Sequence, residues 1–191
     1  LTERNVTSGF ASGNANEVRE SVGVLAGGGP ADVVEFTVAL AREMLALAGQ
    51  PDADVEAALK DGRAMDAWLA MIIAQDGDPD AALPTARETH TVLADRDGVL
   101  TEQLALPFGI AAWRLGAGRA RAQDPVQHAA GIDLHAKPGD EVRAGQPLFT
   151  LSADEPSRFE RALSALDGAW AIGDAGSYVA SGPLVRERIT A

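Results

Sequence analysis

Residues 8–49 decide the fold and read SGFASGNANEVRESVGVLAGGGPADVVEFTVALAREMLALAG. The pattern predicts a loop, a helix, a glycine break and a second helix. Asn14, followed three residues later by Glu17, forms a capping-box pattern, in which a polar oxygen and a carboxylate bind the free amides at a helix start. The glycines at 27–29 end this helix, and Pro30 starts the next at its first position, where a missing N–H costs nothing.

The second predicted helix is apolar over most of its circumference. Asp32 lies at the N-terminal end, where the helix dipole favours a carboxylate. Two adjacent stripes carry the apolar residues, namely Val33, Phe36, Leu40, Met44 and Leu47 on one and Val34, Val38, Ala41 and Leu45 on the other. We therefore predict that this helix is mostly buried. Its apolar stripes, and those of residues 18–25, need partners, so we also expect self-association.

The sequence predicts an α+β fold, with a helical segment at residues 1–86 and an α+β domain at residues 87–191. Further helices are expected at 54–60 and 65–75, the latter with Met65, Trp68, Leu69, Ile72 and Ile73 at core spacing. After residue 86 we expect strands at 89–93 and 99–101, joined by a hairpin turn at Asp97-Gly98, and at 131–134, 141–142, 148–151, 169–172 and 178–189. Helices are expected at 108–115 and 157–166.

The composition excludes several classes of function. The 191 residues carry a net charge of −12, from 28 acidic and 16 basic side chains, which disfavours binding to nucleic acid or to an anionic membrane. No apolar run reaches the roughly 20 residues that cross a bilayer, and no charged-then-apolar leader opens the sequence. The absence of cysteine excludes thiolate chemistry and disulfides within it and fits a reducing compartment, so we expect a cytoplasmic protein.

Two segments resemble the thymidine phosphorylases and pyrimidine-nucleoside phosphorylases. In residues 8–45, GNANEVRE and the GGGP helix start are similar to the family's G-N-A-x-E-V-[RK]-E helix and G-x-G-P helix start. In residues 111–148, LGAGR and GIDLHAKPGDEVRAGQPL are similar to the family's L-G-A-G-R and G-x-x-L-x-x-K-x-G-D-x-V-x-x-G-x-P-L runs. The two segments occur in the family's order and together cover most of the chain.

This resemblance implies a pentosyltransferase that is a homodimer and needs no cofactor. Its reaction would be the reversible phosphorolysis of pyrimidine deoxynucleosides to the base and 2-deoxyribose 1-phosphate. Residues 1–86 would complete an α-domain, and residues 87–191 would form a hammerhead-like α/β domain of the barrel-sandwich hybrid type. The family's phosphate-binding and base-binding segments precede the region that matches, so no catalytic residue maps onto this sequence and we expect the 191-residue chain alone to be inactive.

The resemblance also implies a site for a monovalent or other hard cation such as K⁺. The ligands would be the backbone carbonyls of Ser8 and Ala11 and the carboxylate of Glu20, the oxygen ligands that hard cations prefer. The alternative is that Glu20 is a solvated helix residue paired with an arginine. Just before this loop, Arg4 stands where the family usually has methionine, and the family's turn proline is missing. The preference between thymidine and uridine therefore stays open.

Other interpretations remain. Residues 115–119, LGAGR, follow a predicted helix and fit a helix end better than a phosphate loop. His90, His128 and His135 have no metal-pair spacing. Biotinyl and lipoyl carriers share the G-D-x-V-x-x-G-x-P-L run but carry a lysine in the following hairpin, where this chain has Ser152-Ala-Asp-Glu-Pro156. A scaffold or dimerisation module that keeps the fold without the activity, and a phosphoribosyltransferase relative, are further alternatives.

Overall fold

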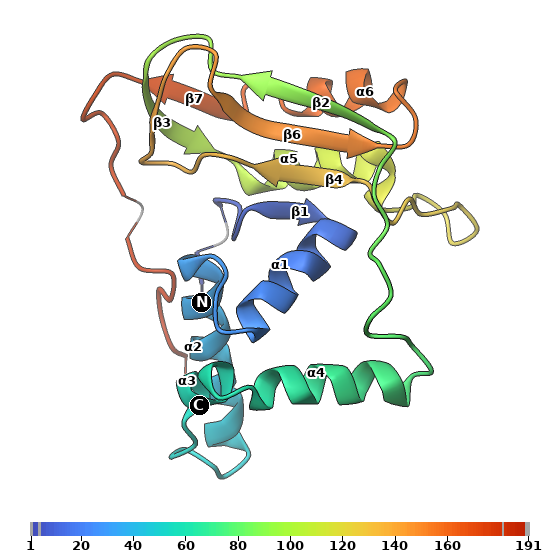
Figure 1. The fold of residues 1–191 in the computed structure, drawn as a ribbon. Coiled ribbons are helices and arrows are strands. Elements are labelled where there is room, and N and C mark those ends of the chain that lie inside the picture. Colours follow the sequence, from blue (N-terminus) through green and yellow to red (C-terminus); the bar gives the residue numbers. More distant parts are fainter. Residues whose placement is uncertain (1, 4, 181, 190–191) are drawn as a thin grey trace.

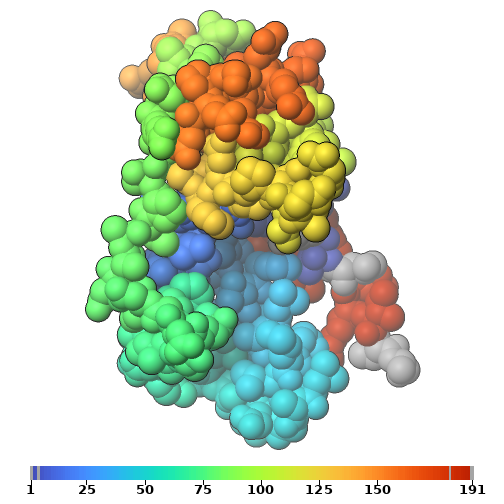
Figure 2. Space-filling view, turned by 90° about the vertical axis from the view of Figure 1, so that its right-hand side faces the viewer, coloured from blue at the N-terminus to red at the C-terminus, as the bar shows by residue number. Residues whose placement is uncertain are grey.

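The computed structural model of the chain describes residues 2–3, 5–180 and 182–189, and it has the α+β class predicted from the sequence. One part of the molecule is helical and consists of α1 (Ala15–Leu25), α2 (Ala31–Leu47), α3 (Val55–Lys60) and α4 (Arg63–Ala74). The other part contains the sheets and two more helices, and a long segment after α4 leads into it (Figure 1). Figure 2 shows these two parts stacked, with residues near the N-terminus recessed between them.

Two antiparallel sheets form the second part. The first has the order β1-β4-β6-β2 and the second has the order β5-β3-β7. Their strands are β1 (Ala11–Gly13), β2 (Glu88–Leu93), β3 (Gly98–Gln103), β4 (Gly131–Leu134), β5 (Glu141–Val142), β6 (Pro147–Ala153) and β7 (Trp170–Gly173). Strand β1 pairs Ala11 with Asp133 and Gly13 with Gly131, so the segment that leads into α1 is an edge strand of the first sheet. The division of the chain at residue 86 stays a prediction.

The hairpin predicted at Asp97-Gly98 is wrong. Strand β2 pairs with β6 and β3 pairs with β5 and β7, so the connection between them passes from one sheet to the other. Its residues contact the turn before β6 instead of closing a hairpin. The Ala94 amide donates to the Gln146 carbonyl, and the Asp97 carboxylate accepts from the Ala144 amide. These long-range bonds redirect the chain, although the local turn chemistry is that of a hairpin.

The main hydrophobic core lies between the sheets and the helices α5 (Ala105–Ala112) and α6 (Arg158–Ala165). Phe149 of β6 is its centre, because its ring meets Phe108 and Trp170 in edge-to-face contacts at centroid distances of 5.1 and 6.1 Å. Such pairs stabilise a core beyond the area that they bury. A short π-helix (Trp113–Ala117) extends α5 and includes Gly116 at φ +114°, so the predicted helix end at LGAGR is confirmed.

The helical part is less buried than its sequence predicts. Within α2, Val38 is buried, whereas Met44 is 64% exposed and Leu47 is 87% exposed. The prediction that α2 is mostly buried is therefore wrong for this chain. The core predicted on α4 is also wrong, because none of its described residues is buried and Ile73 is 61% exposed. The apolar periodicity is present, but the described residues do not cover these faces.

The end of the chain is extended but forms no strand over the described part of residues 178–189, so the strand predicted there is wrong. A single antiparallel bridge joins Val185 to Thr2, and the Glu3 amide donates to the Leu184 carbonyl at 2.7 Å. The tail thus returns to the first residues of the chain. Within the described residues, no helix combines the length and the apolarity that crossing a bilayer requires.

Candidate functional site

The three residues expected to hold a cation line one cavity. This cavity has a volume of about 370 Å³, and Ser8, Ala11 and Glu20 are among its lining residues. Side chains of α2 close one side, with Val33 and Phe36 in the lining. The structure therefore brings the predicted ligand set together, with Ser8 from the loop before β1, Ala11 from β1 and Glu20 from α1. Whether a cation binds there stays a prediction.

Gly9 allows the loop to pass close to α1. Its φ is +65°, in the left-handed region that glycine adopts without strain. A Cβ atom at this position would lie 2.0 Å from Oε2 of Glu20 and 2.9 Å from a methyl of Val33. The loop is therefore packed against the Glu20 carboxylate and the start of α2, and a side chain at residue 9 would force them apart.

Glu20 binds the loop instead of an arginine. Its Oε1 accepts a hydrogen bond from the Phe10 amide at 2.6 Å. Among the residues that the structure describes, no arginine forms an ion pair with Glu20, which argues against the alternative drawn from the sequence. Partial burial raises the pKa of the Glu20 carboxyl, against the lowering effect of the Phe10 amide. A cation in the cavity would offset this cost of burial.

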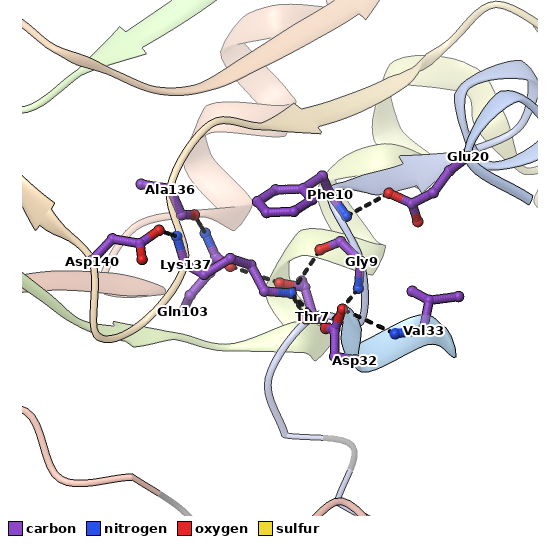
Figure 3. A network of polar contacts seen from close by, with 10 residues as sticks. All are labelled: Thr7, Gly9, Phe10, Glu20, Asp32, Val33, Gln103, Ala136, Lys137 and Asp140. Carbon is purple, nitrogen blue, oxygen red and sulfur yellow. Dashed lines mark hydrogen bonds and ion pairs between the residues drawn. The ribbon is translucent and has the colours of Figure 1, made fainter. Parts of the chain in front are cut away.

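The other side of the loop is held by a residue that no sequence motif singled out. Lys137 lies in the turn between β4 and β5, and its ammonium group donates to the carbonyls of Thr7 at 2.5 Å and Gly9 at 2.6 Å (Figure 3). It also forms an ion pair with Asp32 of α2 at 3.0 Å. Both side chains are largely buried, with 18% of Lys137 and 29% of Asp32 exposed. The ammonium nitrogen lies 5.5 Å from the centre of the Phe10 ring.

Asp32 connects the loop to the start of α2. Its Oδ2 accepts from the Gly9 amide at 3.0 Å as well as from Lys137, and its Oδ1 accepts from the Val33 amide. Burial, the largest single effect, raises the pKa of this carboxyl, but the Gly9 amide and the Lys137 ammonium together hold it below its usual value. Asp32 is therefore a charged partner of Lys137, in addition to its predicted place at the positive end of the helix dipole.

A buried amide side chain completes the attachment of the loop. The Thr7 hydroxyl donates to Oε1 of Gln103 at 2.7 Å, and Nε2 of Gln103 donates to the Ala136 carbonyl at 3.2 Å. Gln103, at the end of β3, is only 1% exposed. The loop at residues 7–10 is thus fixed by contacts to β3, to the β4–β5 turn, to α1 and to α2.

The side chains of the GNAN sequence before α1 bind the sheet-containing part of the molecule and do not form the helix cap that was predicted. The Asn14 side chain makes no bond to the helix amides and donates to the Ala117 carbonyl at 2.7 Å and the Gln127 carbonyl at 3.3 Å. The Asn16 side chain donates to the Ile132 carbonyl at 3.0 Å. The capping box is therefore wrong in its Asn14 half, because carbonyls of the sheet-containing part bind that amide group.

The carboxylate half of the capping box is displaced by one residue. Glu17 accepts from the amide of Gly13 at 2.7 Å, the residue before the one predicted. No histidine is among the described residues that line the cavity beside Glu20. His135 bonds to the Thr150 hydroxyl and His90 stacks near Phe159, and the described residues contain no group of three acidic or histidine side chains that could hold a metal ion. Arg4 lies outside the described residues.

Comparison with known proteins places the chain in a family. Residues 99–173 match the model of the pyrimidine nucleoside phosphorylase C-terminal domain. The thymidine phosphorylase of Mycobacterium tuberculosis is 47% identical over 189 residues, which cover 99% of this chain and 44% of that protein.

Two pyrimidine-nucleoside phosphorylases are also similar to this chain. The pyrimidine-nucleoside phosphorylase of Bacillus subtilis is 39% identical over 157 residues, covering 76% of this chain and 36% of that protein. The pyrimidine-nucleoside phosphorylase of Staphylococcus aureus is 31% identical over 201 residues, covering 100% of this chain and 46% of that protein. The chain thus spans less than half the length of these curated relatives, and it belongs to the family of the thymidine and pyrimidine-nucleoside phosphorylases.

Proposed function

We propose that this chain is part of a phosphorylase that cleaves pyrimidine deoxynucleosides, thymidine above all, with phosphate. The observation that carries this proposal is the 47% identity to a thymidine phosphorylase over 99% of the chain. In the reaction, phosphate attacks C1′ of the sugar while the bond to the base breaks. The products are the free base and 2-deoxyribose 1-phosphate, and the reaction runs in both directions.

This chemistry depends on position and charge. Phosphate must lie below a sugar that becomes oxocarbenium-like, and the negative charge that develops on the base must be stabilised. None of the residues described here matches a group with either task. We propose that the chain contributes the scaffold, namely the loop at residues 7–10 and the helices α1 and α2, and that the phosphate-binding and base-binding groups come from the remaining part of the protein.

We further propose that the cavity beside Glu20 binds a monovalent cation such as K⁺, with the carbonyls of Ser8 and Ala11 as partners. Support comes from the shared cavity and from the partial burial of the Glu20 carboxylate. Titration of the chain with K⁺ by calorimetry should detect binding, and Glu20→Gln should weaken it at least tenfold. Equal affinity in Glu20→Gln would exclude this ligand set.

We propose that the chain self-associates through its helices, as the homodimer implied by the family resemblance would require. The apolar side chains of Leu40, Met44 and Leu47 on α2 are exposed, and such a row is a candidate interface. Sedimentation velocity at micromolar concentration should give a dimer, and Met44→Glu should shift it toward the monomer. A sharp monomer peak for the unchanged chain would contradict this proposal.

The test of the proposed function is an assay for phosphate-dependent release of thymine. The 191-residue chain should be inactive, and the protein as its native source produces it should be active, with an intact mass more than double the 19.8 kDa of this chain. An inactive native protein of 19.8 kDa would favour the scaffold alternative. Release of thymine by the purified chain itself would overturn the proposal that the catalytic groups lie elsewhere.

A further inference from the structure

The ammonium group of Lys137 is surrounded by oxygen atoms from other elements. Its three protons face the carbonyls of Thr7 and Gly9 and a carboxylate oxygen of Asp32, at 2.5, 2.6 and 3.0 Å. The loop supplies two of these acceptors and α2 supplies the third, whereas the lysine comes from the β4–β5 turn (Figure 3). The oxygen cradle is therefore built without any ligand from the lysine's own segment.

This donor set is one that a free cation would choose. Two neutral carbonyls and one carboxylate are hard oxygen ligands, and a lysine ammonium is a compact point charge that they can surround. Ammonium and potassium ions carry the same charge and are similar in size to the lysine head group. The Asp32 carboxylate supplies the only full negative charge in the cradle, and the Gly9 amide holds that carboxylate in place at 3.0 Å.

The loop is clamped between two charged groups. On one side Glu20 accepts from the Phe10 amide, and a Cβ atom on Gly9 would meet the Glu20 carboxylate at 2.0 Å. On the other side Lys137 holds the carbonyls of Thr7 and Gly9. Ser8, which lines the cavity with Glu20, belongs to this loop, and Ala11, another lining residue, follows it as the first residue of β1. The position of the ammonium group thus sets the path of the loop that forms the cavity.

We propose that Lys137 is a tethered monovalent cation, which positions the loop at residues 7–10, and that the oxygen cradle binds free ammonium or potassium when the side chain is removed. Lys137 is a positioning residue, because its ammonium group acts on the carbonyls of Thr7 and Gly9 and on Asp32. The proposal depends on the proposed function in one respect only, namely that the loop matters because it lines the cavity beside Glu20. That the cradle binds a cation is argued from the contacts of Lys137 alone.

The chain offers a matched control, because Lys60 and Lys137 are its two lysines and Lys60 is exposed at the end of α3. Thermal unfolding of Lys137→Ala, Lys60→Ala and the unchanged chain is followed in ammonium chloride and in tetramethylammonium chloride at equal ionic strength. In tetramethylammonium, which is too large for the cradle, Lys137→Ala should unfold about 3–8 °C below the unchanged chain. Ammonium should restore at least half of this loss, and Lys60→Ala should show no loss.

A second background separates this cradle from the cavity beside Glu20. In the double variant Lys137→Ala, Glu20→Gln the ammonium effect should persist, because Glu20 is not a ligand of the cradle. An ammonium effect that disappears with Glu20→Gln, or one that tetramethylammonium reproduces, would overturn the proposal. This readout is stability, so a failure of the proposed phosphorylase activity does not alter it.

If Lys137→Ala does not fold, the unchanged chain gives the answer. With ¹⁵N-labelled lysine, the ammonium protons of Lys137 should exchange slowly enough with water to give an NMR signal, because each has an oxygen acceptor. Those of Lys60 should exchange too fast to be detected. Equal exchange rates for the ammonium protons of the two lysines would show that the cradle does not hold the Lys137 ammonium group and would overturn the proposal.

Discussion

The two parts of the molecule bury their apolar residues to very different extents. The sheet-containing part has a continuous core around Phe108 and Phe149, in which these and many neighbouring side chains are almost fully buried. The helical part has a small cluster of Val24, Val38 and Leu59, and long apolar side chains of α2 and α4 remain exposed. We infer from this difference that the sheet core supplies most of the stability, whereas the helices depend on the junction at residues 7–16, where the chain contacts both parts.

The largest difference should appear when one apolar side chain is truncated in each part. Phe149→Ala removes a ring that is 1% exposed and should lower the free energy of unfolding by about 3–5 kcal/mol. Leu47→Ala, at a side chain that is 87% exposed, should change it by less than about 0.5 kcal/mol. Urea unfolding at low protein concentration measures both. A large loss for Leu47→Ala would mean that α2 is covered in solution and would remove the contrast.

Breaking the junction should have the next largest effect. Lys137→Met removes the lysine's hydrogen bonds to two carbonyls and to Asp32, which keeps those from the Gly9 and Val33 amides, and should cost about 1–3 kcal/mol. Lys60→Met, on an exposed lysine, should cost less than about 0.5 kcal/mol. The same urea titration gives the comparison. If the two variants are equally stable, Lys137 does not hold the parts together.

Adding a methyl group at a glycine with positive φ should destabilise the chain more where neighbouring atoms lie close. Gly9→Ala places a Cβ atom against Glu20 at 2.0 Å and also strains a backbone at φ +65°. Gly49→Ala strains a similar backbone, at φ +76°, but meets nothing within 4 Å. We expect a loss of about 1 kcal/mol for Gly49→Ala and of roughly twice that for Gly9→Ala. Equal losses in thermal unfolding would mean that the loop has room to move away from α1.

The smallest expected effect is a change with pH in the contribution of Asp32 to stability. The pKa of Asp32 lies below its usual value of 3.8 in the folded chain, so the folded state binds this proton less readily than the unfolded chain does. The stabilisation by Asp32 is then complete above pH 3.8 and is lost as the pH falls through the lowered pKa. The difference in stability between the unchanged chain and Asp32→Asn should therefore shrink on acidification from pH 5 toward pH 3.

The contribution of Glu20 to stability should change with pH in the opposite direction from that of Asp32. Its pKa is raised, so the folded state binds this proton more readily, and the gain from that extra proton is lost as the pH rises from 4.5 through the raised pKa. Glu20→Gln should remove this dependence. A difference between Asp32→Asn and the unchanged chain that is constant from pH 5 to pH 3 would contradict the assignment for Asp32.

Local sequence patterns predicted the positions of helices and strands better than they predicted which elements pair or pack together. The glycine break at 27–29, the helix ends and the strands β4 and β6 follow from turn residues and periodicity within a few positions. The placing of β2 and β3 in separate sheets depends on Ala94 and Asp97 bonding to residues some 50 positions later, which no local pattern encodes. The exposure of α2 escaped prediction for a related reason, because periodicity shows that a face is apolar and not whether the chain covers it.

The site was predicted in part. The motif that contains Ser8, Ala11 and Glu20 singled out residues that the structure gathers around one cavity. Lys137 was not singled out as a site residue, because its acceptors lie more than 100 residues away in the sequence. Asn14 was assigned to a helix cap for the same reason. A polar residue near a helix start has a plausible local partner, and only the fold reveals the distant one.

Hydrogen exchange at the loop tests the central claim, that Lys137 holds the helical part to the sheets. The Gly9 amide donates to Asp32 and the Phe10 amide donates to Glu20, whereas the Ala94 amide is bonded within the sheet-containing part and serves as the control. In Lys137→Met the Gly9 and Phe10 amides should exchange at least about tenfold faster, equivalent to roughly 1.4 kcal/mol, with Ala94 unchanged. Unchanged exchange at Gly9 and Phe10 would contradict the account.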